Sequence, residues 1–302
     1  MQLYYSPDYI GAGHDFDTTR KAKWIADSLN SRPIAGAQMC TPVSATVADI
    51  ERVHAHDYVT AVRTGSPLPL AESQGFEWDP DLWPMVLASN GGVLAAARAA
   101  LTDGVAGSLS SGLHHAKYDR GDGFCTFNGL VITAKSLLAS GEVTSVLILD
   151  LDAHCGGGTA ALIADDQRIL QLDVSVSLFD AYPPQLNSQL DEVSMADDYL
   201  PAVHKALAEA DQSSWDLVIY NAGMDPYQGC DIGGLDGITG DILAEREQVV
   251  FDWCRQRSIP IAFVLAGGYI GADLSREGLV NLHRQTISAA VHNERMLVAS
   301  GG

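Results

Sequence analysis

Short apolar runs rich in β-branched residues alternate along this chain with longer segments of helical period. The alternation predicts an α/β fold with a mainly parallel sheet. Several runs are apolar without interruption, as in parallel strands that helices cover on both faces. The predicted strands are 2–5, 105–109, 145–151, 168–174, 217–220 and 259–265. The predicted helices are 17–29, 45–53, 82–101, 128–139, 199–210, 241–257 and 276–291.

The chain reads as one unit. No repeat, low-complexity tract or linker divides its 302 residues, so we expect a single domain over residues 1–302. An α/β fold of this length commonly forms one domain. No stretch approaches the ~18–20 apolar residues of a membrane span, so we expect no membrane partner.

Charge and cysteine content restrict the expected binding partners and the cellular compartment. Lys and Arg number 18 against 38 Asp and Glu, a formal net charge of −20 that disfavours binding to nucleic acid or anionic membranes. The five cysteines form no CxxC pair, which indicates a reducing compartment. The N-terminus has neither a basic start nor an apolar signal region, so we expect a cytoplasmic protein. The sequence leaves the oligomeric state open.

Chemistry-bearing residues follow the predicted strands. The segments SSGLHHA, DLDAHCGGGT, NAGMDPY and AGGY each lie at or just after a strand end. Parallel sheets bind ligands at the carboxyl ends of their strands, because the loops converge there. These four segments therefore indicate one crevice.

The segment LILDLDAHC suggests a metal site. Asp150, Asp152 and His154 are spaced by two residues and share one side of an extended segment. Carboxylates are costly to bury without a cation or another partner. Asp225, after the run DLVIY, could add a third ligand. An Asp₂His site with open positions suits catalysis. The alternatives are hydrated acids at a strand end and an Asp in a turn.

Two further features suggest catalysis. His114 and His115 are adjacent in a Gly-bounded loop, where one imidazole could act as general base and then protonate a leaving amine. Tyr269, after two glycines, could direct a phenol donor at a carbonyl. A polar core histidine and a buried loop aromatic are the alternatives for these residues.

Taken together, the motifs resemble the histone deacetylase family, zinc amidohydrolases on a three-layer, arginase-like α/β fold. The resemblance rests on GLHHAKYDRGDGFCTFN, LDLDAHCGGGT, YNAGMDP and AGGY, in this order, and on the opening YSPDY and TTRKAKWI. It covers nearly the whole chain. It implies a zinc-dependent deacylase with an acylated amine or acyl-lysine peptide as substrate.

The resemblance assigns roles residue by residue. It implies that the zinc ligands are Asp152, His154 and Asp225. It implies that the catalytic residues are His115 as general base and acid, His114 as its electrostatic neighbour, Asp150 as the partner of His114, and Tyr269 as the oxyanion donor. It implies that the substrate-binding residues are Phe124, Tyr182, Gly123 and Gly268, with Phe124 and Tyr182 as the aromatic walls of an acyl-lysine tunnel.

The resemblance also implies cofactors. One Zn²⁺ per chain is expected, and Fe²⁺ or Co²⁺ would suit the same oxygen and nitrogen ligands. A structural K⁺ is implied near Asp150, Asp152 and His154. Arg20 resembles an arginine near an acetate-release cavity.

The chain departs from the family pattern at two positions. Cys155 replaces a second histidine that does not bind zinc, so we expect ligation to survive. Gly157 stands where an Asp or Asn often partners the general-base histidine. We therefore expect His115 to be less strongly oriented, unless another group fills this role.

The substrate and two alternative functions stay open. Asp231, Ile232 and Gly233 follow the third ligand and include no Glu of the kind found in acetylpolyamine-cleaving relatives. The short length and the wording DRGDGFC also resemble smaller members, some of which remove longer acyl chains. An arginase-like metallohydrolase is one alternative, although it needs more ligands. A non-catalytic acyl-ligand binding protein, weakened at Gly157, is the other.

Overall fold

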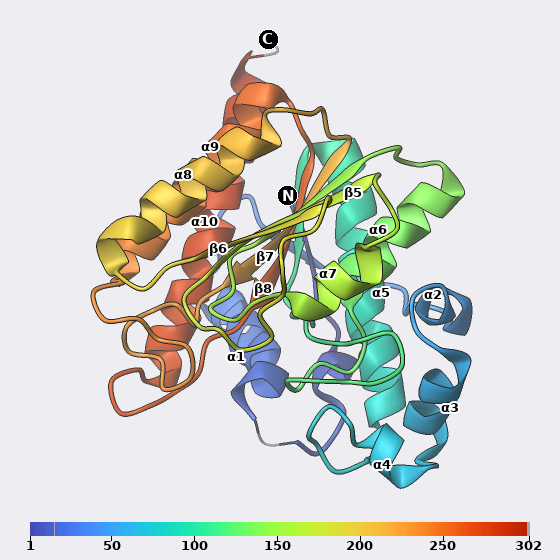
Figure 1. The fold of residues 1–302 in the computed structure, drawn as a ribbon. Coiled ribbons are helices and arrows are strands. Elements are labelled where there is room, and N and C mark those ends of the chain that lie inside the picture. The colour runs from blue at the N-terminus through green and yellow to red at the C-terminus, as the bar shows by residue number, and fades with distance from the viewer. Residues whose placement is uncertain (15, 301–302) are drawn as a thin grey trace.

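One parallel sheet forms the centre of the molecule. The computed structural model describes residues 1–14 and 16–300, with side chains up to residue 292. Within them eight strands pair in the order β2-β1-β3-β8-β7-β4-β5-β6, and every pairing is parallel (Figure 1). The strands are β1 (Gln2–Tyr4), β2 (Gln38–Cys40), β3 (Val105–Ser108), β4 (Val146–Asp150), β5 (Ile169–Ser175), β6 (Ser188–Glu192), β7 (Leu217–Gly223) and β8 (Ile261–Ala266).

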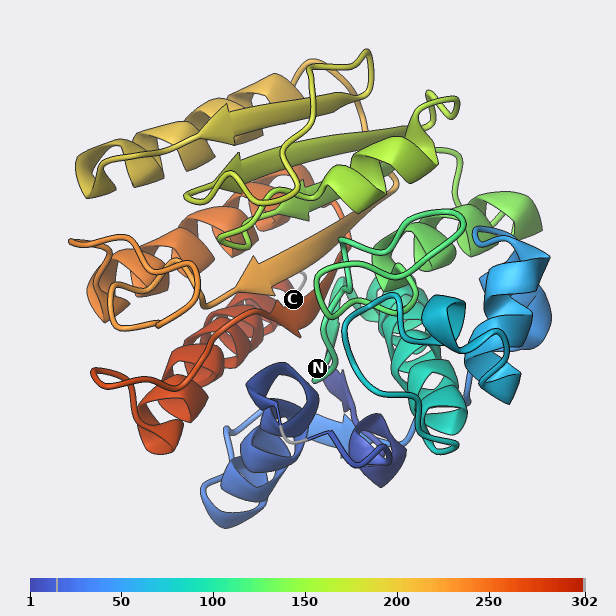
Figure 2. The same ribbon diagram turned by 60° about the horizontal axis from the view of Figure 1, so that its bottom comes forward.

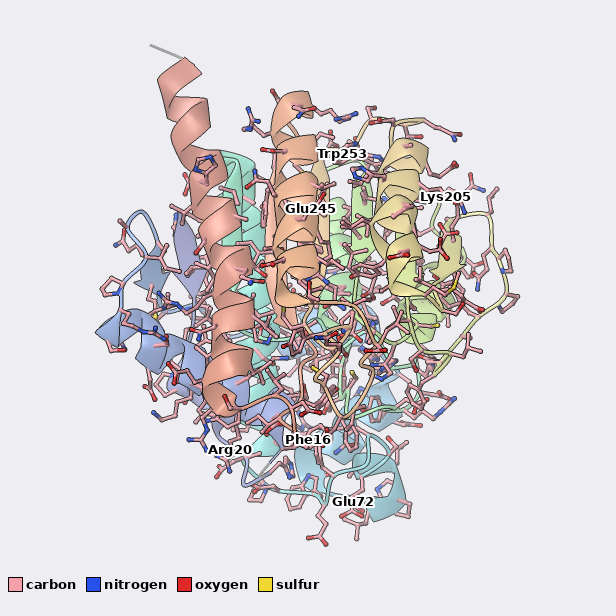
Figure 3. The ribbon with its side chains drawn as sticks, turned by 90° about the vertical axis from the view of Figure 1, so that its left-hand side faces the viewer. Phe16, Arg20, Glu72, Lys205, Glu245 and Trp253 are labelled. Atoms are coloured by element: carbon pink, nitrogen blue, oxygen red, sulfur yellow. The ribbon has the colours of Figure 1, made fainter. Side chains whose placement is uncertain are left out.

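Helices cover both faces of this sheet and make three layers (Figures 1 and 2). One face carries α1 (Asp17–Ser31), α8 (Tyr199–Ala210), α9 (Gly240–Arg257) and α10 (Arg276–Ser300). The last three lie side by side in Figure 3. The other face carries α5 (Leu82–Asp103), α6 (Gly129–Ser140) and α7 (Gly157–Ile163). Shorter helices are η1 (Pro7–Ile10), α2 (Val47–Glu51), α3 (His56–Thr64), α4 (Leu68–Ala71) and η2 (Ala196–Asp198).

Strand alternation divides the core between these faces. In β4, Leu147 and Leu149 join the cluster that includes residues of α8, α9 and α10, whereas Val146 and Ile148 join the cluster with residues of α5 and α6. All four side chains are fully buried. A strand buried on both sides must be apolar throughout, which explains the unbroken runs in the sequence.

The predicted α/β class and parallel sheet are confirmed. Two strands, three α-helices and the two short 3₁₀ helices η1 and η2 were not predicted. β2 is three residues long, and β6 (SQLDE) is polar and partly exposed at the sheet edge, so neither has an apolar strand pattern. α3 and α4 are short, and α7 begins with two glycines, a weak helix signal.

One helix corrects the expectation about membrane spans. α5 is long and apolar enough, by length and composition alone, to cross a membrane. The sequence contains no long unbroken apolar run here, because Ala and Gly residues provide much of the apolar character between scattered polar residues. However, 67% of its most apolar 18-residue stretch is buried inside the fold. The helix contacts β3, β8 and α6, as the core helix of a layered protein does.

Candidate active site

Loops from five neighbouring strands meet at one end of the sheet. In sheet order these strands are β3, β8, β7, β4 and β5, so their carboxyl ends are adjacent. Parallel strands direct all these loops to the same edge. A pocket of ≈ 330 Å³ opens there, lined by His115, Gly123, Phe124, His154, Ser177, Phe179, Ile232, Gly233 and Tyr269.

Two carboxylates and an imidazole form a buried cluster. Asp152 and His154 follow β4, Asp225 follows β7, and their ligand atoms all lie within 4.8 Å of one another. Nδ1 of His154 is 3.2 Å from Oδ1 of Asp152 and 3.2 Å from Oδ2 of Asp225. One imidazole nitrogen carries at most one hydrogen, so it cannot satisfy both carboxylates.

The backbone fixes these carboxylates. The amide of Ala153 donates to Oδ1 of Asp225 at 3.0 Å, and the amide of His154 donates to Oδ1 of Asp152 at 3.1 Å. Gly267 has a positive φ of 50°, and a Cβ there would lie 2.2 Å from Oδ1 of Asp225. Only glycine allows this approach.

Electrostatics within the cluster favour a bound cation. Burial, followed by the charge of Asp152, raises the pKa of Asp225 to about 6. Burial opposes ionisation of Asp152 too, but His114 and His154 hold the pKa of its carboxyl far below the usual range. Both acids contact the imidazole of His154, and they lie too close together to ionise fully without further positive charge. A divalent cation would neutralise both, so the donor set fits a metal.

The two adjacent histidines lie beside this cluster. Nδ1 of His114 is 2.8 Å from Oδ2 of Asp150, the last residue of β4, and its Nε2 is 3.1 Å from Nε2 of His115. The amide of Asn221 donates to the other oxygen of Asp150 at 2.8 Å. The Asp150–His114 pair that the resemblance predicts is thus in contact.

Neighbouring groups shift the pKa values of the two imidazoles in opposite directions. Burial opposes protonation of His114, but the carboxylates of Asp150 and Asp152 outweigh it and raise its pKa to about 10. Burial, followed by the charge of His114, lowers the pKa of His115 to about 4. The pair therefore combines a charged imidazole with a neutral one, an arrangement suited to acid–base chemistry.

His115 has a carboxylate partner that the sequence analysis did not find. Its Nδ1 lies 3.0 Å from Oδ2 of Asp180, in the loop after β5. Of the two outcomes expected at Gly157, the structure shows the second: another chain segment supplies a carboxylate to His115. Cys155 is buried and its thiol donates to the carbonyl of Ser177, away from the acid cluster.

Aromatic side chains line the mouth of the pocket. Tyr269, after β8, lies 5.5 Å from the ring of Phe16, which packs 4.5 Å from Phe124. The ring of Phe179 stands edge-on to His115 at 5.0 Å. Phe16 is labelled near the lower end of the molecule in Figure 3.

Two predicted substrate residues lie elsewhere. Tyr182 does not line the pocket, and its hydroxyl donates to the carbonyl of Gln189 at 3.2 Å, whereas Phe179 does line it. Gly268 does not line the pocket either, and a Cβ on it would lie 2.4 Å from the side chain of Leu279. Gly123 does line the pocket, and a Cβ on it would lie 2.5 Å from the ring of His115.

A buried lysine, next to Arg20 in the sequence, lies near the acid cluster. Lys21 is 1% exposed and its Nζ donates to the carbonyl of Gly267 at 2.7 Å. Burial lowers the pKa of Lys21 to about 8 against the opposing charges of Asp225 and Asp152. The neighbouring Arg20 is only partly buried.

A sequence signal existed for the residues that were missed after β5. Phe179 and Asp180 follow a predicted strand, as the other site residues do. The same strand-end rule would have selected SLFDAY. Lys21 carries no such signal, because it lies on a helix and only packing brings it to the site.

Comparisons with known proteins agree with this geometry. A model of the histone deacetylase domain matches residues 14–279. An uncharacterised protein of Picosynechococcus sp. is 32% identical over 277 residues, covering 88% of this chain and 91% of that protein. Histone deacetylase 2 of Arabidopsis thaliana is 28% identical over 307 residues, covering 94% and 79%.

Solved structures share the fold. The HD domain of HDA15 superposes with a TM-score of 0.80 at 20% identity, covering 97% of this chain and 89% of that one. The acetylpolyamine aminohydrolase of Burkholderia pseudomallei has a TM-score of 0.77 at 18% identity, covering 96% and 98%. At these identities the likeness establishes the three-layer fold.

Proposed function

The chain belongs to the histone deacetylase family, and on that premise we propose that it is a zinc-dependent hydrolase of N-acyl amides. The substrate that we propose is an acetylated lysine side chain or a small acetylated aliphatic amine. The products are acetate and the free amine. The observation that carries this proposal is the buried group of Asp152, His154 and Asp225 beside a pocket that also holds His115 and Tyr269.

The proposed ion is one Zn²⁺ per chain, held by Asp152, His154 and Asp225. These ligands leave positions open for water and substrate, and Fe²⁺ or Co²⁺ would fit the same atoms. When bound, the ion would supply Lewis-acid polarisation of the amide carbonyl and of the attacking water. A structural K⁺ near Asp150, Asp152 and His154 is a further part of the proposal. Among the described residues one such three-ligand group occurs, which favours a single-ion site over the arginase-like alternative.

The histidines would move the proton. Neutral His115, whose Nδ1 faces Asp180, can accept a proton from water at Nε2 and later deliver it to the leaving amine. His114, held by Asp150, keeps a positive charge beside it, which favours the developing negative charge of the tetrahedral species.

Tyr269 and the aromatic walls would position the substrate. Burial and nearby carboxylates raise the pKa of Tyr269, so its phenol stays protonated and can donate to the oxyanion. Phe124 and Phe179 can flank a slender aliphatic chain. At the mouth Ile232 is 41% exposed, so the rim that we propose for substrate entry is apolar there.

The wider setting is also proposed. We assign residues 1–302 to one catalytic domain that works in the cytoplasm on a small or peptide substrate. The net charge of −20 argues against nucleic acid or an anionic membrane as partner.

The test is acetate release from an acetyl-lysine peptide by protein reconstituted with Zn²⁺, compared with metal-free protein. Acetylated diamines and longer acyl-lysine peptides are assayed in parallel to define the substrate. Zinc-dependent release from any of them supports the proposal. Binding of these substrates without turnover by fully loaded protein would contradict it and support a non-catalytic binding protein.

A further inference from the structure

The carboxylate of Asp180 contacts three nitrogen atoms. Oδ2 lies 3.0 Å from Nδ1 of His115 and accepts a hydrogen bond from the amide of Gly158 at 3.1 Å. Oδ1 pairs with the ammonium group of Lys117. The side chain of Asp180 is 12% exposed, so solvent has little access to this network. A largely buried acid with both oxygens engaged has a fixed position.

The loop that carries Asp180 depends on the glycine at position 157. A Cβ on Gly157 would lie 2.2 Å from the backbone oxygen of Asp180 and 2.6 Å from its Oδ1. No real Cβ makes contacts that short. The loop can therefore approach His115 only because position 157 has no side chain.

The backbone of Asp180 is itself unusual. Its φ is 60°, in the left-handed region that Asp tolerates better than most residues. Such a conformation persists where the surroundings hold it, and it concentrates at functional sites. Here the contacts with His115, Gly158 and Lys117 hold it.

We propose that Asp180 is the positioning residue for His115, reaching it through the space that Gly157 leaves. This inference rests on the proposed function, in which His115 is the general base. By accepting the Nδ1 hydrogen of His115, Asp180 fixes the tautomer whose electron pair is on Nε2, the atom 3.1 Å from Nε2 of His114, and it fixes the plane of the ring. It acts through His115, since it does not line the pocket.

A purely structural role makes a different prediction. If Asp180 served only to anchor its loop through Lys117, then Lys117→Ala would damage the protein as much as Asp180→Ala. If Asp180 positions His115, the two variants differ. Lys117→Ala leaves the contact with Nδ1 in place and should cost only a few-fold in kcat.

The first readout is the tautomer of His115, measured by two-bond ¹H–¹⁵N NMR correlations on the zinc-loaded protein and assigned with His115→Gln. We expect the Nδ1–H form in the parent and in Asp180→Asn, whose amide oxygen can still accept. We expect Asp180→Ala to lose it. An Nε2–H tautomer in the parent overturns the proposal without any variant, so the test does not depend on the folding of Asp180→Ala.

The second readout is kinetic. Asp180→Ala should lower kcat on the order of 10²-fold with little change in KM, and Asp180→Asn should recover at least about tenfold of that loss. Asp191→Ala is the matched control, because it removes an Asp–Lys pair with Lys205 far from the pocket and should leave kcat unchanged. Equal kcat in parent and Asp180→Ala overturns the proposal.

Gly157→Ala tests the space itself. It retains every side chain of the network, yet it should push the loop away and reproduce the lost Nδ1–H signal and the lower kcat of Asp180→Ala. A parent-like signal and rate in this variant would contradict the dependence on Gly157. A parent that shows the Nδ1–H signal but releases no acetate would sink the proposed function and leave the contact between Asp180 and His115 standing.

Discussion

At the scale of single residues, removing the hydroxyl of Tyr269 should impair catalysis without affecting metal binding. Tyr269→Phe removes one hydrogen-bond donor and keeps the ring against Phe16. We expect kcat to fall ~10²-fold or more, the usual cost of losing an oxyanion donor, while the zinc content stays at the parent level. Steady-state acetate release with metal analysis checks this. An unchanged rate would remove Tyr269 from the reaction.

The carboxylate of Asp225 should govern metal binding. Asp225→Ala leaves Asp152 and His154, which pair with each other at 3.2 Å and offer an ion too few ligands. We expect bound zinc and activity to disappear together, and metal analysis after dialysis measures the first. Asp191→Ala, which removes a partly buried acid paired with Lys205, is the control that should retain both. Full activity in metal-free Asp225→Ala would refute the metal-dependent mechanism.

The candidate site was partly predictable because its chemistry is local in sequence. Asp150, Asp152 and His154 lie within five residues, so their spacing alone suggested a shared side and a cation. Asp180 was not predictable in this way, because its contact with His115 spans 65 positions and depends on the shape of a loop. The sequence shows that position 157 has no carboxylate. It does not show that Asp180 supplies one to His115 from another loop.

At the scale of elements, the N-cap of α6 links helix stability to the site. Oδ1 of Asn128 accepts from the amide of Val131, while its Nδ2 donates to the carbonyl of His114 at 3.1 Å. Asn128→Ala should lower the free energy of unfolding by roughly 1–3 kcal/mol, the sum of a lost cap and a lost hydrogen bond to the carbonyl of His114, which keeps the amide of Thr159 as a donor at 3.0 Å. It should also lower kcat, because the carbonyl of His114 loses one of the hydrogen bonds that hold it.

A second cap provides the control for this prediction. Thr239 caps α9 by accepting from the amide of Ile242, and it has no contact with the site histidines. Thr239→Ala should cost only about 1 kcal/mol and leave kcat unchanged. Urea unfolding and acetate release measure both variants. A kcat for Asn128→Ala equal to that of Thr239→Ala would show that the cap does not support the site.

Elements with strong patterns were predictable, and those at the margins were not. α8 was predicted with its observed ends, since Tyr199–Ala210 combines a clear apolar face with good helix formers. β6 is an edge strand with a polar sequence, so only its pairing with β5 identifies it. β6 was not predicted because its position at the sheet edge is not encoded in the periodicity of its apolar residues.

At the scale of the whole molecule, the strand order explains why one site draws on distant segments. β3 and β8 are far apart in sequence, yet they are neighbours in the sheet, as are β7 and β4. A parallel sheet brings their following loops to one edge, so His115, Asp225 and His154 meet although 71 positions separate the last two. The sequence predicted that edge, but not the strand order that sets each neighbour.

Stability of the whole fold should depend on pH through His54, a buried histidine outside the metal cluster. Nδ1 of His54 donates to the carbonyl of Lys117 at 2.7 Å, and its Nε2 accepts from the amide of Asn128 at 3.0 Å. Protonation would place a hydrogen on Nε2 against that amide. Burial lowers the pKa of His54 to about 4, whereas an unfolded histidine titrates near 6.5.

The sign of the effect follows from proton uptake. Between about pH 6.5 and 4 the unfolded chain binds a proton at residue 54 that the folded protein does not. The His54 contribution to stability is therefore complete above pH 6.5 and declines as the pH falls, by at most about 1.4 kcal/mol per unit. Other groups titrate too, so the measured quantity is the difference in free energy of unfolding between the parent and His54→Gln. That difference should shift in favour of His54→Gln from pH 7 to pH 4.5, and a constant difference would mean that His54 is accessible to protonation in the folded state.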